Sequence, residues 1–182
     1  ALLEKHGGVW ADATAICMRP LNDWLDEYGA SGFFAYHRPG RDRIMANWFM
    51  ASERECPIVS KLRARLTRFY MENDFQKFSR SQVLAKKFLT QLFNRSHRTT
   101  RYWFSPLVTK GLGIYPYFTF HYLFERLVAL DPECRAIWAN TPKLPANGPL
   151  IHKRHGWYTP LTDAIRREFD DRQFPMYKLT WK

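Results

Sequence analysis

The sequence is poor in cysteine and in acidic residues, and it lacks a long apolar run. Its three cysteines, Cys17, Cys56 and Cys134, show no metal-ligand spacing and cannot all pair with one another. A reduced, cytoplasmic compartment is therefore expected rather than a disulfide framework. No run of about 18 apolar residues occurs, so no segment is expected to span a membrane, and a peripheral position at its inner face stays open.

Acidic residues are outnumbered by basic ones, which bears on the partners of the protein rather than on its fold. The chain has 17 Asp and Glu against 28 Lys and Arg, a formal net charge of +11. Nucleic acid, an anionic membrane surface, or a phosphorylated donor with an acidic glycan would each be attracted by this charge. None of the usual nucleic-acid-binding motifs is present, so a nucleic-acid partner is not expected.

The remaining composition predicts one folded α/β domain. The chain of 182 residues is 46% apolar and 16% aromatic, which is enough to bury a core. Apolar periodicity and turn residues predict a mixed sheet flanked by helices. Expected strands cover residues 9–11, 32–37, 44–51 and 176–181. Expected helices cover 1–6, 21–28, 57–78, 81 onward, 115–130, 131–138 and 162–169, the last capped by Thr159 or Thr162. The first strand is expected to be buried and, in the whole domain, central, although residues 1–182 would lack its N-terminal neighbours. The next two strands are expected to form a hairpin or an adjacent pair beside it.

Two of the expected helices, at 57–78 and from Ser81 onward, are amphipathic and basic. In the second, the apolar positions expected to face inward are Leu84, Phe88, Leu89 and Leu92. The outward basic positions of the two helices include Lys61, Arg65, Lys86 and Lys87. These side chains either form a solvated face or contact an anionic membrane leaflet.

The most informative stretch is Gly7-Gly8-Val9-Trp10-Ala11-Asp12-Ala13-Thr14. Two glycines allow a sharp turn before a short apolar strand, and Asp12 stands at the carboxyl end of that strand. Open α/β sheets bind their ligands beyond the carboxyl ends of strands. A carboxylate there needs a cation or hydrogen-bond donors, so Asp12 is a candidate metal ligand. The alternative is that Asp12 caps the next turn and the glycines only end a helix.

The segment from Leu2 to Thr14, followed by Met18-Arg19-Pro20-Leu21, resembles the donor-site segment of the capsular polysaccharide synthesis proteins. More distantly, it is similar to the glycosyltransferases that share a DXD motif. Weaker resemblance extends through residues 46–51, 115–124 and 177–182. The resemblance implies a GT-A-like fold, a nucleotide-sugar donor, and a glycan or lipid-linked glycan acceptor.

The resemblance also implies roles for particular residues. Asp12 would hold a divalent cation, Mn²⁺ or Mg²⁺, while Thr14 stands where a second carboxylate is usual and is a weaker ligand for a hard cation. Asn47 would lie near the sugar. The donor-binding residues would be Gly7, Gly8, Asp12, Thr14, Lys178, Thr180 and Trp181. Within the helix expected at 115–130, His121 is a candidate catalytic residue whose surroundings could tune it near neutral pH, and a core histidine is the alternative.

In the resembling family the nucleoside-binding part precedes the motif. Residues 1–182 are therefore expected to form the C-terminal portion of one glycosyltransferase domain whose N-terminal part is missing. The predicted function is transfer of a sugar from a nucleotide-sugar onto a growing capsular or other surface polysaccharide. The alternatives are a non-catalytic basic module that binds nucleic acid and an inactive scaffold of polysaccharide assembly.

Overall fold

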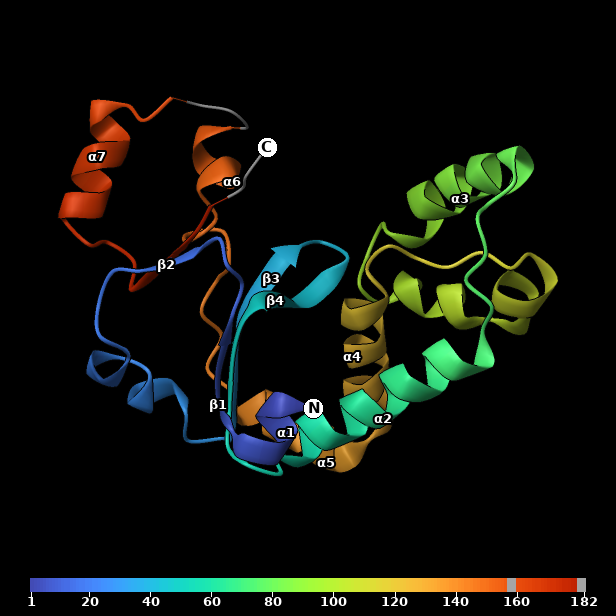
Figure 1. The fold of residues 1–182 in the computed structure, drawn as a ribbon, viewed down its shortest axis with the longest axis horizontal. Coiled ribbons are helices and arrows are strands. Elements are labelled where there is room, and N and C mark those ends of the chain that lie inside the picture. The colour runs from blue at the N-terminus through green and yellow to red at the C-terminus, as the bar shows by residue number, and fades with distance from the viewer. Residues whose placement is uncertain (157–159, 180–182) are drawn as a thin grey trace.

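A small antiparallel sheet lies at the centre of the protein. The structure is a computed structural model that describes residues 1–156 and 160–179 (Figure 1). Its three strands, in the order β1-β4-β3, are β1 (Gly8–Ala11), β4 (Arg43–Ser52) and β3 (Phe33–Gly40). β3 and β4 form the expected hairpin, and β1 pairs antiparallel with β4.

The sheet differs from the expected mixed sheet because both of its strand pairs are antiparallel. The expectation that the first strand is buried is wrong, whereas its central place in a longer domain stays a prediction. In the part of the chain that the structure describes, β1 pairs with β4 alone, and all four of its residues are exposed. A half-covered edge strand explains why Val9 and Trp10, although apolar, reach solvent.

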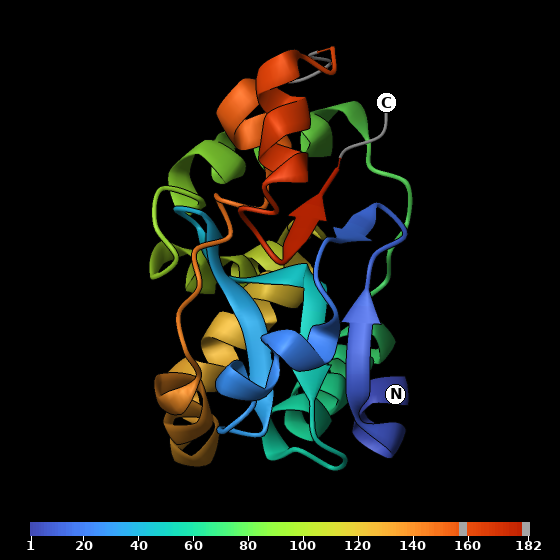
Figure 2. The same cartoon turned by 90° about the vertical axis from the view of Figure 1, so that its left-hand side faces the viewer.

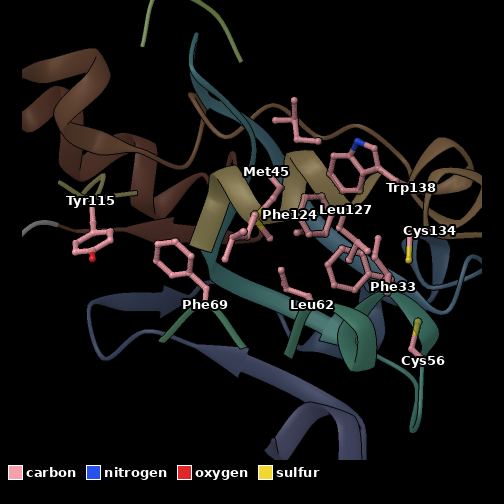
Figure 3. Packing of buried hydrophobic residues seen from close by; sticks show 14 residues of the cluster. Phe33, Met45, Cys56, Leu62, Phe69, Tyr115, Phe124, Leu127, Cys134 and Trp138 are labelled. Atoms are coloured by element: carbon pink, nitrogen blue, oxygen red, sulfur yellow. The ribbon is translucent and has the colours of Figure 1, made fainter. Parts of the chain in front are cut away.

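Three helices cover one face of the sheet: α2 (Pro57–Glu72), α4 (Thr119–Leu130) and α5 (Pro132–Asn140). Figure 3 shows their side chains packing around Phe33 of β3. Phe124 stacks on Phe33 with ring centroids 5.8 Å apart, and Trp138 meets Phe124 edge-on at 5.2 Å. α4 is buried around most of its circumference, as its aromatic content predicts, whereas α2 ends six residues earlier than the pattern to residue 78 indicates.

The other face of the sheet is covered by short segments. Residues 21–28, expected as one helix, form two 3₁₀ turns, η1 (Leu21–Asp23) and η2 (Asp26–Tyr28). The backbone of Trp24 between them departs from helical geometry (φ −148°, ψ −29°), which interrupts the helix. Trp24 is nonetheless buried, with its ring centroid 5.5 Å from that of Phe49.

The two ends of the described chain meet in a second, two-stranded sheet. β2 (Ala15–Cys17) pairs antiparallel with β5 (Met176–Lys178), with Ala15 opposite Lys178. Figure 2 shows β5 beside β2, above the upper end of β1. The short helix α1 (Leu2–His6) precedes β1, and α6 (Ile151–His155) and α7 (Asp163–Asp170) precede β5. Thr162 caps α7 through a hydrogen bond from Ile165 N to its hydroxyl (3.3 Å), as expected.

A helical lobe projects away from the sheet, on the side opposite β2 and β5 (Figure 1). It contains α3 (Arg80–Phe93), a 3₁₀ segment η3 (Thr99–Phe104) and a π-helical turn η4 (Leu107–Gly111). Its small core includes Trp103, Val108, Ile114 and Tyr122. No helix among the described residues is both long and apolar enough to cross a membrane.

Candidate functional site

The carboxylate of Asp12 lies at a tight turn directly after β1. Asp12 N donates to the carbonyl of Trp48 (2.8 Å), which continues the β1–β4 ladder by one residue. Ala15 N donates to the carbonyl of Asp12 (2.8 Å) and closes the turn into β2. The Asp12 side chain is 36% exposed, so its oxygens are accessible to a ligand from solvent.

Lys178 approaches Asp12 from the other end of the chain. Its ammonium lies 3.1 Å from Asp12 Oδ2 and also donates to the hydroxyl of Thr14. The backbone reinforces the contact, because Leu179 N donates to the carbonyl of Thr14 (2.9 Å). The Lys178 side chain is only 16% exposed. The structure therefore brings together three of the predicted donor-site residues, Asp12, Thr14 and Lys178.

The strand that carries Lys178 is bonded to α7 at Glu168, a buried residue whose ion pair the sequence interpretation missed. Glu168 of α7 is buried, and its backbone carbonyl accepts a hydrogen bond from the hydroxyl of Tyr177 (3.3 Å). The guanidinium of Arg154 donates to both carboxylate oxygens, and His155 Nε2 lies 3.2 Å from one of them. Hydrogen bonding from Arg154 lowers the pKa of Glu168 to about 2. Arg154 is thus engaged in holding α6 to α7.

The two glycines lie at the opposite end of β1 from Asp12. Gly7 turns the chain from α1 into β1 with a φ of +67°, and a Cβ on it would come within 2.8 Å of the backbone nitrogen of Arg54. Gly8 pairs with Ser52 in the sheet. The close backbone approach accounts for Gly7 without a ligand, so donor contact by Gly7 and Gly8 stays a prediction.

Asn47 and His121 differ in their position relative to this turn. Asn47 is half-buried in β4 and precedes Trp48, the residue whose carbonyl binds Asp12 N, so the register places it next to the turn. His121 is buried in α4, and its charged neighbours, Arg43 and Asp42, belong to the β3–β4 turn. No described contact joins His121 to Asp12.

The protonation of His121 also differs from the expectation. Burial, helped by the nearby charge of Arg43, lowers the pKa of His121 to about 3. The imidazole is therefore neutral at physiological pH, and the idea that its surroundings tune it near neutrality is wrong. Its Nδ1 is buried and finds no hydrogen-bond partner among the described residues, which is uncommon for a polar atom in a core. A catalytic role for His121 stays a prediction.

The turn offers few ligands for a metal ion. Asp12 contributes one carboxylate and Thr14 one hydroxyl, and both contact the ammonium of Lys178. The described residues contain no group of three or more His, Cys, Asp or Glu side chains that could hold a metal. Thr180 and Trp181, predicted to close over a diphosphate, lie outside the described residues.

The fold is that of an α/β protein. Its exposed strand β1 leads into Asp12, whose carboxylate contacts the ammonium of Lys178. Comparison with known families carries the identification further. The model of the family described as "Capsular polysaccharide synthesis protein" matches residues 1–103, more than half of the chain. The chain belongs to this family, which confirms the family inferred from the Leu2–Thr14 segment.

The comparisons found no match among curated proteins or among solved structures. The family match includes Asp12, Thr14 and Asn47, whereas His121 and Lys178 lie beyond it. The membership implies a role in capsular polysaccharide synthesis. It does not by itself assign a reaction or a GT-A-like fold, both of which remain predictions.

Proposed function

We propose that this protein is a glycosyltransferase that moves a sugar from a nucleotide-sugar donor onto a growing capsular or other surface polysaccharide. The observation that supports the proposal is the contact of the Lys178 ammonium with Asp12 and Thr14, at the end of β1. These residues come from opposite ends of the sequence. A lysine can bind a phosphate group directly, and a carboxylate beside it can hold a divalent cation that also contacts phosphate.

In the proposed reaction, one bond to the anomeric carbon breaks and another bond to the same carbon forms. The bond from that carbon to the donor phosphate oxygen breaks, and a bond to an acceptor hydroxyl forms as the hydroxyl loses its proton. The nucleoside diphosphate leaves with the bonding electrons and gains negative charge. In this proposal Lys178 turns its ammonium from Asp12 toward the departing phosphate and offsets that charge in a partly buried position, where the effect is larger than in water.

A divalent cation, if one takes part, would be held by Asp12. Mg²⁺ is commonly bound through one or two carboxylates together with substrate phosphates. Asp12 supplies one carboxylate, the smaller of these two numbers. When bound, the ion would add positive charge beside the diphosphate. Thr14 would support Lys178 rather than the ion, because its hydroxyl already accepts from the ammonium. Asn47, next to the turn, is the candidate for contact with the sugar.

The proposal is tested by measuring donor hydrolysis and transfer with a panel of nucleotide-sugars and the full-length protein. Asp12→Asn and Lys178→Met should each lower the rate by about a hundredfold or more, because charge stabilisation of the leaving group is lost. Lys178→Arg keeps the charge and should retain part of the activity. The matched control is Asp26→Asn, an exposed carboxylate in η2.

Metal dependence is measured in the same assay by titrating Mn²⁺ or Mg²⁺ after treatment with a chelator. Normal rates in both Asp12→Asn and Lys178→Met would overturn the site. Donor binding without turnover by any donor would favour the inactive scaffold. Retention on DNA without nucleotide-sugar binding would favour the nucleic-acid-binding module.

A further inference from the structure

The apolar side of α3 is turned to solvent rather than to the core. Leu84 is 70% exposed, Phe88 64% and Leu92 39%, although the pattern predicts that they face inward. Helix geometry advances roughly 100° per residue, so these three positions form one continuous row along the helix. The inward contacts are made instead by Ala85, Leu89 and Phe93, on the adjoining side.

Two exposed apolar residues lie beside the covered side of α3. The carbonyl of Leu112 accepts a hydrogen bond from Gln82 of α3 (2.9 Å), and the ring of Tyr102 lies 5.7 Å from that of Phe93. Both Leu112 and Tyr102 are themselves exposed. We call the row Leu84, Phe88 and Leu92 the α3 apolar surface.

The surroundings of the α3 apolar surface are cationic. No Asp or Glu occurs between Asp74 and Glu125. The same stretch contains eight basic residues: Lys77, Arg80, Lys86, Lys87, Arg95, Arg98, Arg101 and Lys110. Lys86 is half-buried over the ring of Phe78, contrary to the expectation that it points outward. The others are exposed.

We propose that the α3 apolar surface inserts into the interfacial layer of a membrane that contains anionic lipid. An exposed aliphatic and aromatic row on a helix that carries basic but no acidic residues is the pattern of a helix that lies in the plane of a membrane surface. At 14 residues, α3 is too short to cross a bilayer, for which about 20 are needed. Arg80, Lys87 and Arg95 contact the lipid phosphates while the apolar row enters between the acyl chains.

Charge complementarity favours this occupant over two others. A second copy of the chain would bring two cationic surfaces together, which like-charge repulsion opposes. Nucleic acid would satisfy the cations but would leave Leu84 and Leu92 in water, because single strands bind by stacking on aromatic rings. Of the lysines first considered for leaflet contact, Lys61 is excluded as a free cation because it binds Asp131 and Glu133.

The inference is independent of the proposed glycosyltransferase activity. α3 lies at the far end of the molecule from β2 and β5, where Asp12 and Lys178 meet (Figure 1). A variant can therefore lose membrane binding and keep donor hydrolysis in solution, or lose donor hydrolysis and keep membrane binding.

The test is sedimentation of the purified protein with two kinds of vesicle. One contains phosphatidylcholine alone, and the other also contains about one-third phosphatidylglycerol, which gives its surface a strong negative potential. The protein should bind the anionic vesicles and not the neutral ones. The triple variant L84Q/F88Q/L92Q should lose binding by about tenfold or more, since less apolar surface enters the membrane. Its matched control is L2Q/L130Q/L161Q, which changes three leucines that are also exposed but lie elsewhere.

The electrostatic part is tested by R80Q/K87Q/R95Q against R166Q/R167Q/R172Q, which removes the same charge from exposed positions in and after α7. The first should weaken binding about fivefold for each cation removed, and the second should have a smaller effect. Equal binding by L84Q/F88Q/L92Q and the wild type would overturn the proposal. So would a wild-type dimer that this variant makes monomeric, or retention on DNA without vesicle binding.

Discussion

Lys178 reaches Asp12 only because several residues far from the turn hold its strand in place. Lys178 N donates to the carbonyl of Pro149 (2.9 Å), and its neighbour Tyr177 is fully buried. The hydroxyl of Tyr177 in turn binds the backbone of Glu168, whose carboxylate is held by Arg154. The strand of Lys178 is thus joined to α7, and α7 is joined to α6 by the ion pair of Glu168 and Arg154.

Removing Arg154 should destabilise the protein in a pH-dependent way. Arg154→Met leaves the buried carboxylate of Glu168 without its guanidinium and should cost about 2 kcal/mol at pH 7, less than for a fully buried pair because Arg154 is partly exposed. In the wild type the folded pKa of Glu168, about 2, lies below its ordinary value of 4.5. This contribution is present above the unfolded pKa and is lost as pH falls through the folded pKa.

This pH dependence is checked by measuring the free energy of unfolding in urea at several pH values. The difference between wild type and Arg154→Met should be largest near neutrality and should shrink below pH 4.5. Arg166→Met, at an exposed position in α7, is the control and should change little. A difference that is constant from pH 7 to pH 3 would show that the ion pair is not its source.

Gly7 and Gly8 allow a test that separates backbone strain from steric clash. Both have positive φ, +67° and +90°, which disfavours a side chain at either position. A Cβ at Gly7 meets the backbone of Arg54 at 2.8 Å, whereas one at Gly8 meets nothing within 4 Å. Gly8→Ala should therefore cost about 1–2 kcal/mol for the left-handed conformation alone, and Gly7→Ala clearly more.

Thermal unfolding of the two alanine variants measures the difference. If Gly7 and Gly8 serve the donor rather than the fold, both variants would unfold like the wild type and lose donor binding instead. Equal destabilisation by the two substitutions would show that Arg54 moves aside and that the clash contributes nothing.

At the scale of residues, the sequence predicted the site only where family resemblance assigned it. Asp12, Thr14 and Lys178 were placed together by their resemblance to a donor site, and the structure does bring them into contact. Glu168 and Arg154 could not be found in this way, because an ion pair between two helices leaves no local pattern in the sequence. His121 shows the reverse error, since a polar residue in an apolar helix says nothing about its pKa.

At the scale of elements, the apolar periodicity predicted the positions of the helices better than it predicted which side of each helix is buried. Pro57 and Asp131 start helices as expected, because proline fits the first turn and aspartate caps it. In α3 the apolar sector is wider than the core that it meets, and the sequence does not show which half is covered. The structure covers the half that contains Leu89 and leaves the half that contains Phe88 exposed.

The start of α3 is fixed by a capping box, which can be tested directly. The Ser79 hydroxyl accepts from Gln82 N (3.3 Å), and the Gln82 side chain accepts from Ser79 N (2.9 Å). Ser79→Ala removes one of these bonds and should cost about 1 kcal/mol. Hydrogen exchange of the α3 amides and the urea midpoint measure the loss, with Thr90→Ala, in the exposed middle of α3, as the control. Unchanged exchange in the first turn would mean that the cap contributes nothing.

At the scale of the whole molecule, the sequence predicted the class of fold but not the connectivity of the sheet. Helices and strands combine as expected in an α/β protein, and the β3–β4 hairpin lies beside β1. Strand direction was not predictable, because a four-residue apolar strand reads alike in parallel and antiparallel sheets. Nor was the pairing of β2 with β5 predictable, since it joins residues more than 150 positions apart.

The free edge of β1 leads to a prediction about association of the whole molecule. Among the described strands β1 pairs with β4 on one side alone, and Trp10 projects from it to solvent with 46% of its surface exposed. Unpaired strand edges with apolar side chains promote pairing between molecules, and a lysine at such an edge opposes it. The 182-residue chain should therefore self-associate as its concentration rises, and Trp10→Lys should keep it monomeric.

Sedimentation velocity over a range of concentrations measures this association. Leu130→Lys is the control, because Leu130 is an exposed apolar residue at the end of α4 and carries the same change of charge. If the edge of β1 is responsible, only Trp10→Lys shifts the protein toward the monomer. Equal shifts in both variants would point to net charge rather than strand pairing, since added charge of one sign opposes association wherever it lies on the surface. A wild-type chain that stays monomeric at every concentration would show that the twist and shortness of β1 are enough to protect its edge.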